Sequence, residues 1–87
     1  MFDRKDENYI YEVVSKNIKE QRRLRGWTQE VLANKTSYSK QFISNIESKN
    51  FQTFSLGTVW RIALVMNLEM DELFKEKKTT VTAVQNR

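Results

Sequence analysis

Apolar residues recur every three or four positions along two stretches of the chain, which is the spacing of one face of an α-helix. The first set is Ile10, Val13, Val14, Ile18 and Leu24. It predicts a helix over about residues 9–25, ended by Gly26, because glycine commonly follows the last turn of a helix. The second set is Leu56, Val59, Ile62, Ala63 and Met66. It predicts another helix over residues 56–66, with Ser55 as its N-cap.

Between these stretches the pattern predicts two short helices, over residues 29–35 and 40–48. Each follows a polar residue that can cap it, Thr28 and Ser39. Helices of this length are not stable in isolation, so they must be locked together by their apolar residues. These residues are Leu32, Ala33, Ile43 and Ile46.

The two ends of the chain are expected to differ from the middle. A short fifth helix over residues 70–75 would bury Leu73 and Phe74. Residues 1–8 are predicted to form a flexible N-terminal arm, and residues 76–87 a polar C-terminal tail. The domain itself is therefore expected to span residues 9–75, and to be entirely helical.

The composition argues against an enzyme. The 87 residues include no histidine and no cysteine, so the commonest general acid or base and the commonest metal ligands are missing. Two glycines, Gly26 and Gly57, cannot form a glycine-rich phosphate loop. We expect no catalytic residues, no cofactor, no metal and no small-molecule substrate.

The chain is also expected to work in the cytoplasm, away from membranes. No apolar run approaches the roughly 20 residues of a membrane span. The N-terminal residues lack the apolar stretch of a secretion signal, and the absence of cysteine fits a reducing compartment.

The net charge of +4 is concentrated in one part of the chain. Residues 18–50 contain seven lysines and arginines against three glutamates, whereas the basic and acidic residues of the remainder balance. A contiguous basic segment suits a polyanionic partner such as DNA. The alternative is a solvated surface that is basic by chance.

Several short sequences occur in a recognisable order and spacing: Thr28-Gln29-Glu30, Leu32-Ala33, Tyr38-Ser39, Ile43-Ser44, Ile46-Glu47, Ser55-Leu56, Ile62-Ala63, Leu68 and Asp71-Glu72-Leu73-Phe74. In these residues the chain resembles the phage repressor/Cro-like (XRE-type) helix-turn-helix transcriptional regulators. The resemblance implies a compact, all-α, five-helix lambda-repressor-like DNA-binding domain. Such domains usually have glycine where Ser37 stands, so we expect a positive backbone φ at Ser37.

The resemblance also implies that the helix beginning at residue 40 is the recognition helix. Its outward side chains would meet base edges in the major groove: Lys40, Gln41, Ser44 and Asn45. Lysine can donate to guanine, and glutamine can form two hydrogen bonds with adenine. Phosphates of the DNA backbone would be contacted by Gln29, Ser39, Lys49 and Asn50. The alternative is that these are ordinary solvated residues, and that Ser39 is a helix cap only.

Other matching residues are expected to support the fold rather than to touch DNA. Arg22 and Glu47 occupy positions that form an internal ion pair in relatives, so we interpret both as structural. Phe42 is expected to pack against Tyr38, with contact to a thymine methyl as the alternative. Trp27 is expected to belong to the core.

The fourth predicted helix carries a second apolar stripe, which usually meets another chain. We expect a homodimer through Trp60, Leu64, Leu68 and the short fifth helix; the alternative is that Trp60 lies against the N-terminal arm. The predicted function is a dimeric repressor that binds a near-palindromic operator in double-stranded DNA. Its type would be that of a phage, a mobile element or a restriction–modification controller. The alternative is a protein-interaction module, antitoxin-like or adaptor-like, that acts through Trp60 and Leu64.

Overall fold

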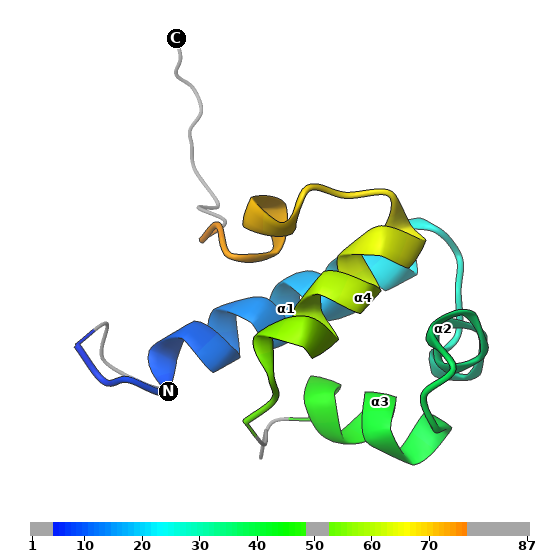
Figure 1. Cartoon of the computed structure of the whole chain (residues 1–87), viewed down its shortest axis with the longest axis horizontal. Helices are drawn as coiled ribbons and strands as arrows, with labels where there is room; N and C mark the ends of the chain where they lie inside the picture. The colour runs from blue at the N-terminus through cyan, green and yellow to red at the C-terminus, as the bar shows by residue number, and fades with distance from the viewer. Residues whose placement is uncertain (1–4, 49–52, 77–87) are drawn as a thin grey trace, which may run out of the picture.

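The computed structural model describes residues 5–48 and 53–76. They form four α-helices and one 3₁₀ helix: α1 (Tyr9–Leu24), α2 (Gln29–Thr36), α3 (Lys40–Glu47), α4 (Leu56–Met66) and η1 (Met70–Leu73). Figure 1 shows α2 and α3 together on one side of the pair formed by α1 and α4. Lys49 and Asn50, most of the predicted tail and half of the predicted arm lie outside the described residues.

Three of the four α-helices, α2, α3 and α4, begin where the polar caps predict. The hydroxyl groups of Thr28, Ser39 and Ser55 accept a hydrogen bond from the backbone N–H three residues later, at 3.0 to 3.1 Å. Each bond satisfies one of the N–H groups that a helix leaves unpaired in its first turn. The three predicted N-caps are confirmed.

The ends of the helices depend on the left-handed region of backbone space. Gly26, which follows α1, has φ 71°, and Ser37 at the end of α2 has φ 66°. Asn67 ends α4 in the same conformation, with φ 58°. The positive φ expected at Ser37 is therefore confirmed, and serine holds a conformation that glycine adopts with less strain.

The short fifth helix predicted over residues 70–75 is shorter than expected, and it is a 3₁₀ helix and not an α-helix. The segment forms a single 3₁₀ turn, Met70–Leu73, with backbone bonds from Glu72 to Glu69 and from Phe74 to Asp71 at 3.0 Å. A segment this short cannot offset the cost of nucleating an α-helix, so its conformation follows from burial of Leu73. Leu73 is completely buried.

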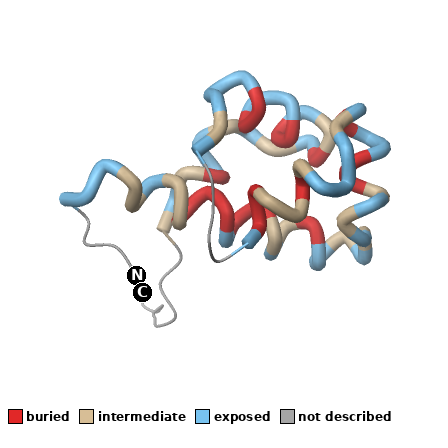
Figure 2. Tube along the Cα trace, turned by 90° about the horizontal axis from the view of Figure 1, so that it is seen from below, coloured by how far each residue is buried: buried red, intermediate tan, exposed pale blue. Residues whose placement is uncertain are grey.

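The core is formed by the inward faces of all four α-helices and η1, which Figure 2 shows as buried stretches turned toward the middle of the molecule. Its buried members are Val14, Ile18, Leu32, Ala33, Ile43, Ile46, Val59, Ile62, Ala63, Met66 and Leu73. These residues come from both long helices and both short ones. The short helices are therefore stabilised by tertiary packing, as their length requires.

Three residues assigned to the inward stripes are exposed instead. Leu24 is 70% exposed, Leu56 is 68% exposed and Ile10, in the first turn of α1, is 38% exposed. At about 100° per residue, Leu24 is rotated roughly 120° from Ile18 around α1, which places it off the core face. Leu56 lies in the first turn of α4 and is rotated toward Trp60, outside the arc that faces the core.

Among the described residues, no helix combines the length and the apolar character that a bilayer span requires.

Candidate nucleic-acid interface

Helix α3 has one side in the core and one side directed to solvent. Ile43, Ile46 and Glu47 are buried. The four residues predicted to meet base edges lie outside this buried set: Lys40 and Gln41 are exposed, and Ser44 and Asn45 are half-buried. The structure thus brings all four onto one surface, and Gln41 Nε2 donates a hydrogen bond to Asn45 Oδ1 at 2.9 Å.

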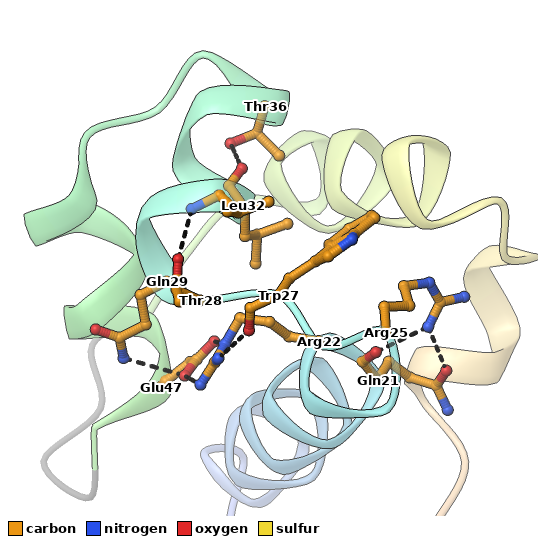
Figure 3. Close-up of polar contacts among 10 residues, drawn as sticks. Gln21, Arg22, Arg25, Trp27, Thr28, Gln29, Leu32, Thr36 and Glu47 are labelled. Carbon is orange, nitrogen blue, oxygen red and sulfur yellow. Dashed lines mark hydrogen bonds and ion pairs between the residues drawn. The ribbon is translucent and has the colours of Figure 1, made fainter.

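A buried ion pair holds α3 against the end of α1. Arg22 Nε and Nη2 donate to the two carboxylate oxygens of Glu47 at 2.8 and 2.9 Å, which is a bidentate arrangement. This is the ion pair that the resemblance implies. Both residues are only 7% exposed, so water screens the attraction between their charges little. Figure 3 shows the pair beneath the loop that leads into α2.

Two further contacts extend this ion pair into a network. Arg22 Nη1 donates to the backbone oxygen of Trp27 at 2.7 Å. Gln29 Nε2, from the first turn of α2, donates to Glu47 Oε1 at 3.1 Å (Figure 3). The predicted phosphate-contacting residue Gln29 therefore also braces α3, because it binds the same carboxylate as Arg22.

The turn between α2 and α3 is stabilised by contacts of the Tyr38 ring. The rings of Tyr38 and Phe42 lie 4.7 Å apart between centroids, tilted by 58°, so the predicted packing of Phe42 against Tyr38 is confirmed. The Arg61 guanidinium of α4 lies 5.2 Å from the centre of the same Tyr38 ring. Arg61 Nη1 also donates to the backbone oxygen of Thr36 at 3.2 Å.

Three polar residues that the sequence does not reveal as important tie distant elements together. Asn17 on α1 is buried and donates to the backbone oxygens of Leu73 and Lys75 at 2.8 and 2.7 Å. Arg25 donates to the backbone oxygen of Met66, at the end of α4, at 2.6 Å. Arg61 is the third, through its bond to α2 described above. No local signal marks them, because each partner lies 25 to 58 residues away.

Trp27 is half-buried rather than fully in the core. It packs against the core cluster, and the Lys35 ammonium lies 4.8 Å from its ring centre. The Arg25 guanidinium lies 5.8 Å from the same centre. The indole thus contacts both the core and two cations, an arrangement that stabilises the α1–α2 connection.

Helix α4 presents a different kind of surface. Trp60 and Leu64 are each 56% exposed, and together with Leu56 they form a line at four-residue spacing along the helix, the α4 stripe. A groove of about 290 Å³ adjoins its C-terminal half, lined among others by Trp60, Leu64, Leu68 and Met70. The predicted dimer residues Trp60, Leu64 and Leu68 therefore lie together. Leu56 lengthens the exposed apolar surface toward the start of α4.

Within the described part of the chain, no group of three acidic residues is arranged to hold a metal ion.

This arrangement is found in known proteins. Residues 18–73 match the family model HTH_3, described as helix-turn-helix. The chain belongs to the HTH_3 family. This is the XRE-type family of DNA-binding helix-turn-helix transcription regulators. The match covers most of the described helical elements, from the middle of α1 to the end of η1.

Solved structures similar to this HTH_3 protein include two restriction–modification controller proteins. C.Esp1396I is 29% identical, with a TM-score of 0.69, and the alignment covers 78% of this chain and 87% of that one. C.AhdI from Aeromonas hydrophila is 23% identical, with a TM-score of 0.68 and coverage of 74% and 96%. SinR, a master regulator for biofilm formation solved in complex with DNA, is 22% identical, with a TM-score of 0.66 and coverage of 71% and 98%. No curated protein matches the chain in sequence.

Proposed function

We propose that this HTH_3 protein is a dimeric, sequence-specific repressor that reads the DNA major groove with α3. The observation that carries the proposal is the polar outer side of α3, held in place by the buried Arg22–Glu47–Gln29 network. An α-helix fits the major groove of B-DNA, where each base pair presents its own pattern of donors and acceptors. A rigidly backed helix positions its side chains before binding, which lowers the entropic cost of recognition.

In this proposal the contacts divide into two classes. Lys40, Gln41, Ser44 and Asn45 meet base edges and set the sequence preference. Gln29, Ser39, Lys49 and Asn50 meet phosphates and set the position of the protein on the duplex. The N-terminus of α2 adds unpaired N–H groups and a favourable dipole for the phosphate near Gln29.

Dimerisation would occur through the α4 stripe and Leu68. A second copy covers exposed apolar side chains, and two copies can contact two half-sites about 34 Å apart on one face of the duplex. The operator is therefore expected to be near-palindromic. Similarity to C.Esp1396I and C.AhdI supports a controller of a restriction–modification system as the biological type, and a phage or mobile-element repressor is the alternative.

The test is selection of bound duplexes from a random DNA pool. Anisotropy titrations then compare the affinity for the most enriched duplex with the affinity for a scrambled duplex. The proposal expects an enriched inverted repeat, bound at least about a thousandfold more tightly than the scramble. Lys40→Ala should weaken binding, whereas Lys16→Ala removes the same charge from an exposed position of α1 and should have little effect. A pool that remains random would overturn the proposal.

A second candidate function is a protein-interaction module that acts through the α4 stripe. The exposure of Trp60 and Leu64 favours it, because large apolar side chains in a line usually mark a protein contact. Salt separates the two candidates. Binding to DNA through several phosphate contacts weakens steeply as salt rises, whereas an apolar protein interface responds little.

A further inference from the structure

The two amide side chains on the outer side of α3 are joined to each other. Gln41 and Asn45 are four residues apart, so they lie one above the other on the helix surface. Gln41 Nε2 is the donor and Asn45 Oδ1 is the acceptor, at 2.9 Å. Ser39 caps the helix through its bond to Phe42, and Glu47 anchors it at the other end, so the backbone that carries both amides is held at both ends.

This bond determines which hydrogen-bonding groups of Gln41 remain available. A glutamine amide has two N–H donors and one carbonyl oxygen. Because one donor is used by Asn45, Gln41 offers outward one N–H and the oxygen. Without Asn45 the amide can rotate and offer both N–H groups.

The available pair distinguishes the two purines. Adenine presents an acceptor, N7, beside a donor, the N6 amino group, whereas guanine presents two acceptors, N7 and O6. One donor beside one acceptor complements adenine. Against guanine, the Gln41 oxygen would face O6, and two acceptors would meet without a hydrogen between them.

We propose that Asn45 is a positioning residue that orients the Gln41 amide so that α3 selects adenine over guanine at one base pair. The inference rests on the proposed function, since it concerns the same helix and the same groove. It changes the role of Asn45, whose acceptor atom is directed to Gln41 rather than to a base. Gln41 then remains the residue that touches the base.

The experiment measures the preference between two duplexes that differ only at the base pair read by Gln41, A·T in one and G·C in the other. That base pair is the one at which Gln41→Ala relaxes the preference of the selected operator. Competition titrations then compare the wild-type protein with Asn45→Leu, which removes the acceptor, and Asn45→Asp, which keeps it. Asn34→Leu makes the leucine substitution at an exposed position of α2 and serves as the matched control.

Asn45→Leu should lower the adenine-over-guanine preference roughly two- to tenfold, the effect of one net hydrogen bond. Asn45→Asp should keep the preference and weaken binding to both duplexes alike, because the added carboxylate repels phosphates. In a Gln41→Ala background, Asn45→Leu should change the preference at this base pair no further. Asn34→Leu should leave the preference unchanged.

Three results would overturn the positioning role. Asn45→Leu could keep the full preference, Asn45→Asp could lose it as Asn45→Leu does, or the loss could fall on another base pair and persist without Gln41. The last result would make Asn45 a direct reader. A wild-type protein that selects no sequence would overturn the proposed function and the positioning role together, so the two failures are distinguishable.

A measurement without DNA tests the contact itself. In the free protein, the side-chain amide protons of Gln41 should change their NMR chemical shifts in Asn45→Leu and keep them in Asn34→Leu. Unchanged Gln41 signals in both variants would overturn the proposal whatever DNA the protein binds.

Discussion

The outer surfaces of α3 and α4 differ in kind, although both helices bury a regular apolar face in the same core. Helix α3 directs Lys40, Gln41 and Asn45 outward. Helix α4 directs Leu56, Trp60 and Leu64 outward, each more than half exposed. The surface of α3 consists of groups that form directional hydrogen bonds. The surface of α4 consists of apolar groups, whose removal from water is favourable in free energy.

The support behind the two surfaces differs as well. Behind α3 lies a buried, bidentate ion pair with a third partner, Gln29, and behind α4 lies mainly apolar packing from Val59, Ile62 and Met66. Directional contacts require a fixed helix position, because hydrogen bonds weaken steeply with misalignment. Apolar contacts tolerate small shifts. The comparison agrees with the proposed function, in which α3 meets the polar groups of a DNA groove and α4 meets a second apolar surface.

The largest expected effect comes from breaking the support of α3. Arg22→Ala leaves the Glu47 carboxylate buried without its cation and should destabilise the fold by about 3–5 kcal/mol. For a domain of this size the Tm should fall by roughly 12 °C or more. Thermal unfolding followed by circular dichroism, at one fixed protein concentration, measures it. Lys16→Ala removes the exposed Lys16–Glu12 pair and should cost only about 0.3–0.5 kcal/mol, so equal losses in the two variants would refute the comparison.

The next effect tests the α4 stripe. Trp60→Ala removes the largest exposed apolar side chain and should weaken dimerisation by about 2 kcal/mol or more, as for a central interface aromatic. Sedimentation should show a shift toward monomer with the helix content unchanged. Leu24→Ala truncates an exposed apolar residue on α1, outside the α4 stripe, and should leave the dimer intact. An unchanged Trp60→Ala dimer would place the interface elsewhere.

Gln41→Ala tests the polar surface of α3 and leaves the ion pair that holds the helix unchanged. It should cost about 1–3 kcal/mol on the preferred operator and relax the preference at one base pair, as expected for a lost base contact. Anisotropy titrations on the operator and on single-base variants measure it, with Asn34→Ala as the control. A uniform loss on every sequence would show that Gln41 does not read a base.

The smallest effect concerns the turn that orients α3. Ser37 has φ 66°, so Ser37→Gly should relieve strain and stabilise the fold by about 1 kcal/mol, offset in part by the greater freedom of glycine when unfolded. The Tm measured by circular dichroism should rise by a few degrees. Asn67→Gly also introduces glycine at a positive φ, 58°, but asparagine tolerates this conformation better than serine. This variant should therefore gain less stability than Ser37→Gly. A loss of stability in Ser37→Gly would contradict the argument.

Much of the fold could be predicted because its signals are local. Thr28, Ser39 and Ser55 mark helix starts through bonds to residues three positions away. The positive φ of Ser37 is implied by the family resemblance, because such domains usually have glycine at that position. The predictions failed where the local signal was weak or ambiguous. Residues 70–75 are too few to specify an α-helix, and apolar spacing placed Leu56 inward although it lies at the edge of its arc.

The sequence by itself determined the starts of α2, α3 and α4 with their caps, the segment that carries the positive charge and the polar character of the outer side of α3. These depend on periodicity and on contacts between near neighbours. Only the tertiary structure decided that Asn17, Arg25 and Arg61 bind carbonyl groups of distant elements, and that Gln29 shares Glu47 with Arg22. The reason is physical: each such bond joins residues far apart in the chain, and it forms only after packing of the core has brought their helices together.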